Sequence, residues 1–226
     1  MKIKLLSLFF LNSWFLYGQT KEALSIQFIP SYEEEVLLLD EAPFEKADLQ
    51  IEALKVYISQ LSLLKKGTTV FSEANSYHLL DAENPVSLKL ALSIPTDLAF
   101  DQLSFKIGID SLTNCSGVYG GDLDPTQGMY WTWQSGYINF KLEGTATNCP
   151  ARKNQFQFHL GGYQYPYNSL QEVVLDLETS KEIVIPIKID EFLQDIDLKE
   201  TYEVMSPSST AVKLAESLTH IFTVSK

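Results

Sequence analysis

The sequence predicts a mainly β protein, a β-sandwich of short antiparallel strands with a short C-terminal helix. Apolar and polar side chains alternate in many short segments, which is the period of a strand with one buried face. Turn residues separate these segments at regular intervals, and a capped helical pattern occurs only near the end of the chain. No Pro- or Gly-rich linker and no repeat divides the sequence, so residues 19–226 are expected to form a single domain.

The first half of the chain contributes several of these segments. Leu24, Ile26 and Phe28 predict a strand that ends at Pro30, and residues 36–39 form a short apolar run. Residues 49–64 fit both a helical stripe and a strand. The β-branched and aromatic residues at 56–58 favour a strand there. Further strands are expected at 68–71, 77–80, 86–92 and 103–107.

In the second half, Phe156, Phe158 and Leu160 alternate, which places His159 on the opposite face of the same strand. Segments 173–177 and 183–189 predict two more strands. Pro186 marks the second as an edge strand, because proline cannot donate to a ladder. Ser208 is a suitable N-cap for a C-terminal helix that carries apolar residues at 212, 215 and 218.

The first 18 residues resemble a secretory signal peptide. Lys2 and Lys4 precede an apolar run, and Leu16-Tyr17-Gly18 provides a cleavage site, so the mature chain is expected to begin near Gln19. The apolar run is too short to span a bilayer, and no transmembrane segment is expected in the mature chain. An exported protein, periplasmic or at the cell surface, is therefore predicted.

The charge balance argues against anionic partners. Removal of Lys2 and Lys4 with the signal takes the formal net charge from −12 to −14. Nucleic acid and anionic lipid both require a basic surface, so neither is an expected partner.

The chain is organised around residues 122–144, where aromatic residues are dense. A turn at residues 124–128 precedes Met129, Trp131 and Trp133, which would share one face of an extended strand, with Tyr130 and Tyr137 close by. Beyond residues 135–136 the apolar positions shift to 138, 140 and 142, which predicts a bulge or bend at Ser135-Gly136. The tryptophans therefore belong either to a binding site or to a sandwich core.

Two cysteines, Cys115 and Cys149, flank this stretch. In an exported protein an even pair is usually a disulfide, which here would add roughly 4 kcal/mol of stability on the chain-entropy model. Free thiols and thiolate ligation of a metal are the alternatives.

Recognisable enzyme motifs are absent, so the protein is not expected to be an enzyme. Asp122 and Asp124 come nearest to a paired-carboxylate site, and a loop with Pro and Gly explains them at least as well. Of the three histidines, His159 and His78 are candidate metal ligands, since imidazole is a common ligand of copper and zinc. His220 lies at the end of the predicted helix, where a cation suits the helix dipole.

Three motifs carry a resemblance to a known family. F-K-I-G-I-D-S (105–111), L-D-P-T-Q-G-M-Y-W-T-W-Q-S-G-Y-I-N-F-K-L-E-G (123–144) and F-H-L-G-G (158–162) closely resemble the MbnP-like family of methanobactin-associated, periplasmic or surface copper-binding proteins. The sequence looks like the form found in Bacteroidetes-type bacteria. The clear match covers residues 105–162, and the two termini carry little signal.

The resemblance implies a β-rich domain whose copper site combines histidine with kynurenine, the oxidation product of tryptophan. His159 matches the histidine of the Phe-His-Leu-Gly motif, Trp131 and Trp133 occupy the Trp-x-Trp positions, and His78 matches more loosely. Met129, Tyr130 and Tyr137 would line the pocket. The implied partners are a MauG-type diheme cytochrome c peroxidase and an outer-membrane copper uptake system.

Copper(I) is the expected metal ion, because neutral imidazoles in a soft pocket suit its low coordination numbers. Two other hypotheses remain open from the sequence. The aromatic stretch could stack on a glycan or peptide without any metal. Alternatively, the domain is purely structural, with the tryptophans in its core.

Overall fold

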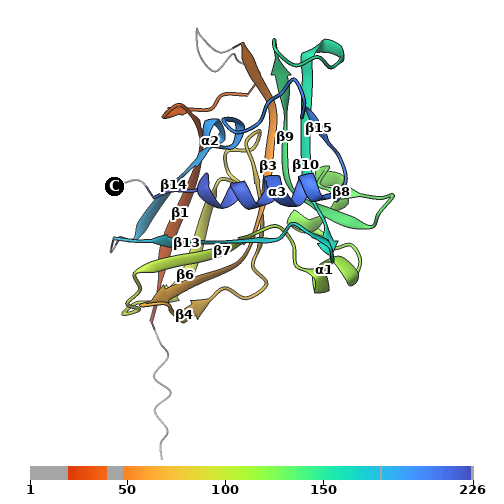
Figure 1. Cartoon of the computed structure of the whole chain (residues 1–226). Helices are drawn as coiled ribbons and strands as arrows, with labels where there is room; N and C mark the ends of the chain where they lie inside the picture. The colour runs from red at the N-terminus through yellow and green to blue at the C-terminus, as the bar shows by residue number, and fades with distance from the viewer. Residues whose placement is uncertain (1–19, 40–47, 179, 225–226) are drawn as a thin grey trace, which may run out of the picture.

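The computed structural model describes residues 20–39, 48–178 and 180–224 (Figure 1). The predicted signal peptide lies outside the described residues. The first sheet contains β1 (Lys21–Tyr32), β2 (Glu35–Val36), β6 (Lys89–Pro95) and β14 (Glu182–Lys188). The second sheet contains β3 (Leu49–Lys65), β4 (Thr68–Ser72), β5 (Tyr77–Asp81), β7 (Gln102–Ile107), β8 (Tyr130–Trp131), β9 (Gly136–Ala146), β10 (Gln155–Gly161), β13 (Gln171–Asp176) and β15 (Glu203–Val204). A separate hairpin pairs β11 (Tyr163–Gln164) with β12 (Tyr167–Asn168).

Strand β3 is the backbone of the second sheet. At 17 residues it is far longer than a typical strand, and it pairs with β9 and then β7 along one edge and with β5 and then β4 along the other. The strand that the sequence favoured for residues 49–64 is therefore confirmed. The path across the sheet runs β13–β7–β3–β9–β10–β15.

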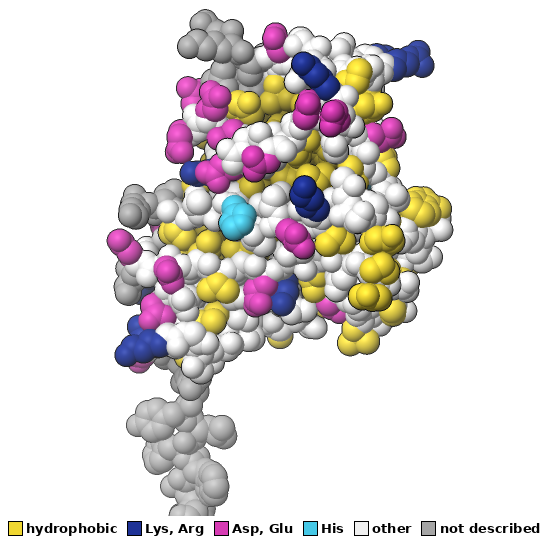
Figure 2. Space-filling view, in the orientation of Figure 1, with side chains coloured by type: hydrophobic (Ala, Val, Ile, Leu, Met, Phe, Trp, Pro, Cys, Tyr) yellow, Lys and Arg dark blue, Asp and Glu magenta, His cyan; other side chains and the backbone are white. Residues whose placement is uncertain are grey.

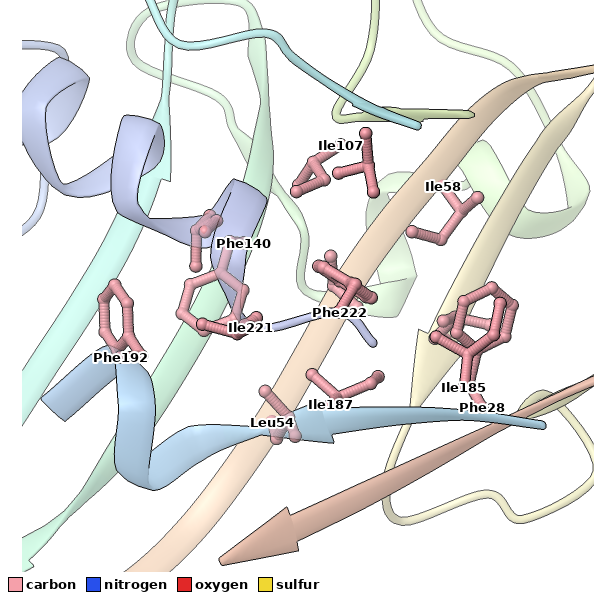
Figure 3. Close-up of a cluster of buried hydrophobic side chains, with 14 of the residues drawn as sticks. Phe28, Leu54, Ile58, Ile107, Phe140, Ile185, Ile187, Phe192, Ile221 and Phe222 are labelled. Atoms are coloured by element: carbon pink, nitrogen blue, oxygen red, sulfur yellow. The ribbon is translucent and has the colours of Figure 1, made fainter. Parts of the chain in front are cut away.

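The main hydrophobic core lies between the two sheets. In Figure 3, Phe28, Ile185 and Ile187 of the first sheet face Leu54, Ile58, Ile107 and Phe140 of the second, with Phe222 between them. Phe28, Phe105 and Phe222 meet edge to face, with ring centroids 5.3 to 6.4 Å apart. Such geometry is preferred by aromatic quadrupoles and adds to the burial energy.

Two helices close the open side of this core. Helix α2 (Ile189–Leu193) continues directly from β14 and buries Phe192 against Phe140 and Phe158. Helix α3 (Ser209–Ser217) crosses in front of the second sheet and packs on β10 (Figure 1). The predicted cap is confirmed, since Ser208 Oγ accepts a hydrogen bond from the Ala211 N–H at 3.1 Å.

The predicted fold class is confirmed, although the sheets are strongly curled and mixed rather than purely antiparallel. Strand β14 pairs with β1 in parallel, and β15 pairs with β10 in parallel. The alternation of apolar residues does not carry strand direction, so the sequence could not reveal these pairings. No helix among the described residues has the length and apolar character needed to cross a membrane.

Candidate functional site

A second hydrophobic cluster lies on the outer face of the second sheet, opposite the main core. It is built on β3, β5, β8 and β9, and we call it the aromatic cluster. Its buried members are Tyr57, Leu79, Ile109, Leu123, Met129, Trp131, Tyr137 and Ile138, with Tyr77 and Tyr130 packed against them. Met129 and Tyr137 are therefore core residues, and neither is open to a ligand in the way that pocket-lining residues would be.

The loop over this cluster is fixed by hydrogen bonds. Tyr57 Oη donates to the Asp122 carbonyl at 2.8 Å, and Tyr137 Oη donates to the Leu123 carbonyl at 3.0 Å. Oδ2 of Asp122 in turn accepts from the Leu79 N–H at 3.0 Å. Burial and the neighbouring Tyr137 and aspartates raise the pKa of Tyr57 far above its usual range, so its hydroxyl remains a donor. The acidic residues here organise a loop, as the sequence indicated.

Two asparagines that the sequence did not single out brace the same region. Asn139 Oδ1 accepts from the Ile109 N–H, and its Nδ2 donates to Ser169 Oγ. Asn114 Nδ2 donates to the Ile109 and Asp110 carbonyls, while its Oδ1 accepts from the Tyr137 N–H. Both side chains are buried, and each bonds through its oxygen and its nitrogen, which fixes the loops on either side of the aromatic cluster.

The two tryptophans occupy different environments. Strands β8 and β9 form a hairpin in which Trp131 lies opposite Gly136, and residues 132–135 make the turn. Trp131 is 6% exposed and Trp133, within the turn, is 65% exposed. Their ring centroids are 5.9 Å apart and the planes are tilted by 45°. The pair therefore links a buried indole to an exposed one.

The predicted common face for Met129, Trp131 and Trp133 is wrong for Trp133, because the strand turns back one residue before it. Ser135 has a φ of +53°, which the turn requires. The predicted bend at Ser135-Gly136 is confirmed, since the turn ends at Ser135 and β9 begins at Gly136. A separate bulge lies further along, at Asn139, where the register between β9 and β10 shifts. That extra residue puts Ile138 on the outer face, whereas Phe140 faces the main core.

Trp131 packs directly against the strand that carries His159. A Cβ placed on Gly161 would lie 2.7 Å from Cζ3 of Trp131 and 2.6 Å from the Tyr137 carbonyl oxygen. The glycine thus lets the indole rest on the backbone of β10. His159 and Gly161 are two residues apart on β10, so their side-chain positions share a face. Phe158 and Leu160, the alternate residues of the strand, face the main core. His159 and Trp131 therefore occupy adjacent positions on the outer face.

His159 is almost buried and is paired with a carboxylate. Its Nε2 lies 2.5 Å from Oε1 of Glu143 on the neighbouring strand β9, and Lys141 Nζ lies 3.7 Å from the same oxygen. The hydrogen bond to His159, together with Lys141, holds the pKa of Glu143 below its usual range despite partial burial. The predicted orientation of His159, away from the main core, is confirmed.

His78 lies elsewhere. It pairs across β3 with Ile58 and shares the face of Leu80, a main-core residue, so it projects to the opposite side of the sheet from His159. Strands β3 and β9 separate β5 from β10, a lateral distance of roughly 14 Å. Nε2 of His78 is bonded to Glu73 Oε2 at 2.7 Å. The structure does not bring the two predicted histidine ligands together.

The predicted disulfide is also contradicted, because Cys115 and Cys149 are free thiols. Cys115 is exposed at the end of α1 (Ser111–Cys115), close to the start of β9, and Cys149 follows the end of β9. That strand has 11 residues and extends for roughly 30 Å, far beyond the approximately 7 Å limit on Cα separation in a disulfide. Sγ of Cys149 is buried and donates to the Gln155 carbonyl at 3.0 Å.

The site offers few donor atoms for a metal ion. Among the described residues, no group of three or more histidine, cysteine, aspartate or glutamate side chains is arranged to hold a metal ion. The outer face of β10 instead offers one imidazole, with the Trp131 indole against Gly161 two residues away and Trp133 next to Trp131. That set fits a soft ion of low coordination number if an indole is converted into a ligand, and it does not fit a site that includes His78.

Known proteins resemble this chain in sequence and in fold. A family model described as MbnP matches residues 21–206 of the 226-residue chain. Among solved structures, the fold is similar to that of MbnP from Methylosinus trichosporium, with a TM-score of 0.63 and 15% identity over 85% of this chain and 87% of that one. No curated protein matches the sequence. The family is linked to methanobactin-associated copper handling. The family model, which spans both sheets and the aromatic cluster, shows that the chain belongs to the MbnP family.

Proposed function

We propose that this protein is an exported copper-binding protein, in which His159 and an oxidised tryptophan hold Cu(I) for acquisition, storage or delivery. The observation that carries the proposal is the contact of Trp131 with Gly161, two residues beyond His159 on the outer face of β10. That contact supports a site shared by His159 and the tryptophan pair. An unmodified indole offers only an N–H donor and a π face, so a second ligand depends on oxidation.

Trp133 is the proposed site of that oxidation. It is the exposed member of the pair, and a partner enzyme can approach its ring, whereas Trp131 is enclosed by the aromatic cluster. Insertion of two oxygen atoms across C2–C3 of the indole, followed by hydrolysis that releases C2 as formate, leaves kynurenine with an aniline nitrogen and a ketone oxygen. The oxidising equivalents would come from peroxide through a diheme cytochrome c peroxidase of the MauG type.

The test is a Cu(I) competition titration of protein purified from its native host, with the intact mass measured on the same sample. The expected result is one-to-one binding and a mass consistent with kynurenine at Trp133, which peptide mapping would locate. His159→Ala is expected to abolish tight binding. His78→Ala is the matched control, because it removes a histidine with the same kind of carboxylate partner on the other face of the sheet. Equal loss in the two variants would contradict the proposed site.

One observation favours a second candidate function, the binding of an uncharged glycan. Exposed apolar and aromatic side chains gather on the α1 segment, the β8–β9 turn and the β11–β12 hairpin, at the right-hand edge in Figure 2. They are Leu112, Val118, Tyr119, Trp133, Tyr165 and Tyr167. Ser111 Oγ donates a hydrogen bond to the Tyr163 carbonyl at 2.8 Å, so α1 and the β11–β12 hairpin are neighbours.

This surface carries little charge. Between Lys106 and Lys141 the charged residues are three aspartates, and residues 155–171 contain no Asp, Glu, Lys or Arg. Aromatic rings on a neutral surface suit stacking on sugar rings. Titration of the Trp133 fluorescence with maltohexaose, cellohexaose and laminarihexaose would test the idea. A saturable response that Trp133→Ala removes would support it, and a flat response to all three would contradict it.

A further inference from the structure

The pairing of His159 with Glu143 determines which ring nitrogen remains for a metal ion. His159 lies directly opposite Lys141 on β9, and Glu143 is two residues further along the same face. The antiparallel ladder therefore fixes both ends of the Nε2–Oε1 contact of 2.5 Å. Because the His159 side chain keeps only 8% of its surface exposed, rotation of its ring away from Glu143 would require the surrounding packing to open.

The protonation of this pair follows from the acceptor. A carboxylate can only accept hydrogen bonds, so the nitrogen that contacts it must carry the hydrogen. Oε1 of Glu143 also faces the ammonium group of Lys141, 3.7 Å away, which favours the carboxylate form. Nε2 is then the N–H of the imidazole, and the lone pair of the neutral ring lies on Nδ1.

Nδ1 is free to act as a ligand. The described residues provide His159 with one side-chain hydrogen bond, the one from Nε2. Among those residues the one enclosed side-chain nitrogen or oxygen without a partner is Oδ1 of Asp190, so Nδ1 of His159 still reaches solvent. Metal-bound histidines commonly use one nitrogen for the metal and the other to donate to a carboxylate.

We propose that Glu143 is a positioning residue that keeps His159 in the Nε2–H tautomer and directs Nδ1 towards the copper ion. This inference rests on the proposed function, because it concerns the same site. Glu143 itself does not touch the metal. It fixes the ring orientation and removes Nε2 from the set of ligands.

The first measurement needs no metal. Two-bond ¹H–¹⁵N spectra of histidine-labelled apoprotein, recorded about two units above the ordinary imidazole pKa of ~6.5, distinguish the two neutral tautomers and the imidazolium. We expect an Nε2–H signature for His159 and a loss of that single-tautomer signature in Glu143→Ala. An Nδ1–H signature, or a doubly protonated ring, in the unsubstituted protein would overturn the assignment. Purely structural support by Glu143 would leave the tautomer unchanged in the variant.

The second measurement is the Cu(I) affinity of Glu143→Ala and Glu143→Gln. Loss of a carboxylate behind a metal-bound histidine typically costs 10- to 100-fold in affinity, and we expect a loss in that range. Glu73→Ala removes the equivalent partner of His78 and is expected to leave the affinity unchanged. Unchanged affinity in Glu143→Ala would overturn the role of Glu143. A complete absence of Cu(I) binding by the unsubstituted protein would instead refute the proposed function, while the apoprotein spectra would still decide the tautomer.

Discussion

Trp131 and Gly161 are in contact because residue 161 has no side chain, and this contact joins the tryptophan hairpin to the strand of His159. In Gly161→Ala, the added Cβ would meet both the indole and the Tyr137 carbonyl, so the hairpin must shift. Overpacking of this kind costs about 1–3 kcal/mol. We expect a lower melting temperature, an altered near-UV circular dichroism of the tryptophans and weaker Cu(I) binding.

Gly120→Ala is the matched control for that substitution. A Cβ at residue 120 meets no atom within 4 Å, and its φ of −94° is accessible to alanine. Thermal melts and copper titrations of the two variants side by side check the prediction. Equal behaviour of the two variants would show that Gly161 does not support Trp131.

Iodide quenching should separate the two tryptophans in protein that lacks residues 1–18. Trp133 is 65% exposed and should provide the quenchable emission, whereas Trp131 is 6% exposed and should be protected. We expect Trp133→Phe to remove most of the quenching and to leave stability nearly unchanged. Trp131→Phe should keep the quenching and lower the melting temperature, because it leaves a cavity in the aromatic cluster. The reverse assignment would contradict the hairpin described above.

The two cysteines should differ in their reactivity with a thiol reagent. Cys115 is exposed and should react in the native protein, whereas Cys149 is buried and should react only after unfolding. Cys149→Ser is expected to destabilise the fold by about 1–3 kcal/mol, because it changes a buried side chain in the main core. Cys115→Ser should have little effect. Identical migration of the protein on a denaturing gel with and without reductant would exclude a disulfide between the two cysteines. A shift in its mobility would contradict two free thiols.

Asp110 should give the loops around the aromatic cluster an acid-sensitive component of stability. Its carboxylate accepts from Tyr77 Oη at 2.7 Å and from the Thr113 N–H at 2.9 Å. Burial on its own would raise the pKa of Asp110, but these bonds hold it below the usual range. A lowered pKa stabilises the folded state above the unfolded pKa of about 3.9, and that contribution is lost as the pH falls through the folded pKa.

The melting temperature of Asp110→Asn should therefore lie below that of the unsubstituted protein at neutral pH. The difference should shrink as the pH falls below about 4, where the unsubstituted carboxyl also becomes neutral. Asp195→Asn, at an exposed position, is the control. A difference that stayed constant down to the most acidic pH would contradict an electrostatic role for Asp110.

Much of the fold was predictable from the sequence, because period-two alternation is a local property. It located β7, β10 and β13 and placed His159 on the outer face. Turn geometry and strand pairing depend on contacts that alternation does not encode, and here the predictions failed. Trp133 was expected to share a face with Trp131, but it lies in a turn. Ile138 was expected to share a face with Phe140, but a bulge separates the two residues.

The candidate site was predictable only in part for a related reason. The tryptophans, His159 and Glu143 all lie within the recognised motifs, but the role of Glu143 comes from the register between β9 and β10, which the motif does not reveal. Gly161 did carry a local signal, since a glycine within a strand often marks a close approach of another group. The disulfide prediction followed from the number of cysteines and the predicted export, and it could not take into account the strand that holds the two thiols apart.

The second sheet carries a hydrophobic cluster on each face, and neighbouring residues of β3, β9 and β10 contribute to opposite faces. The main core on the inner face supports the architecture, while the residues of the candidate site occupy the outer one. Substitution at alternate positions can therefore change the proposed ligands on the outer face and leave the inner packing intact. A relative with this same architecture need not bind copper, because the fold does not determine the ligands. The side chains on the outer face of its second sheet would decide whether it does.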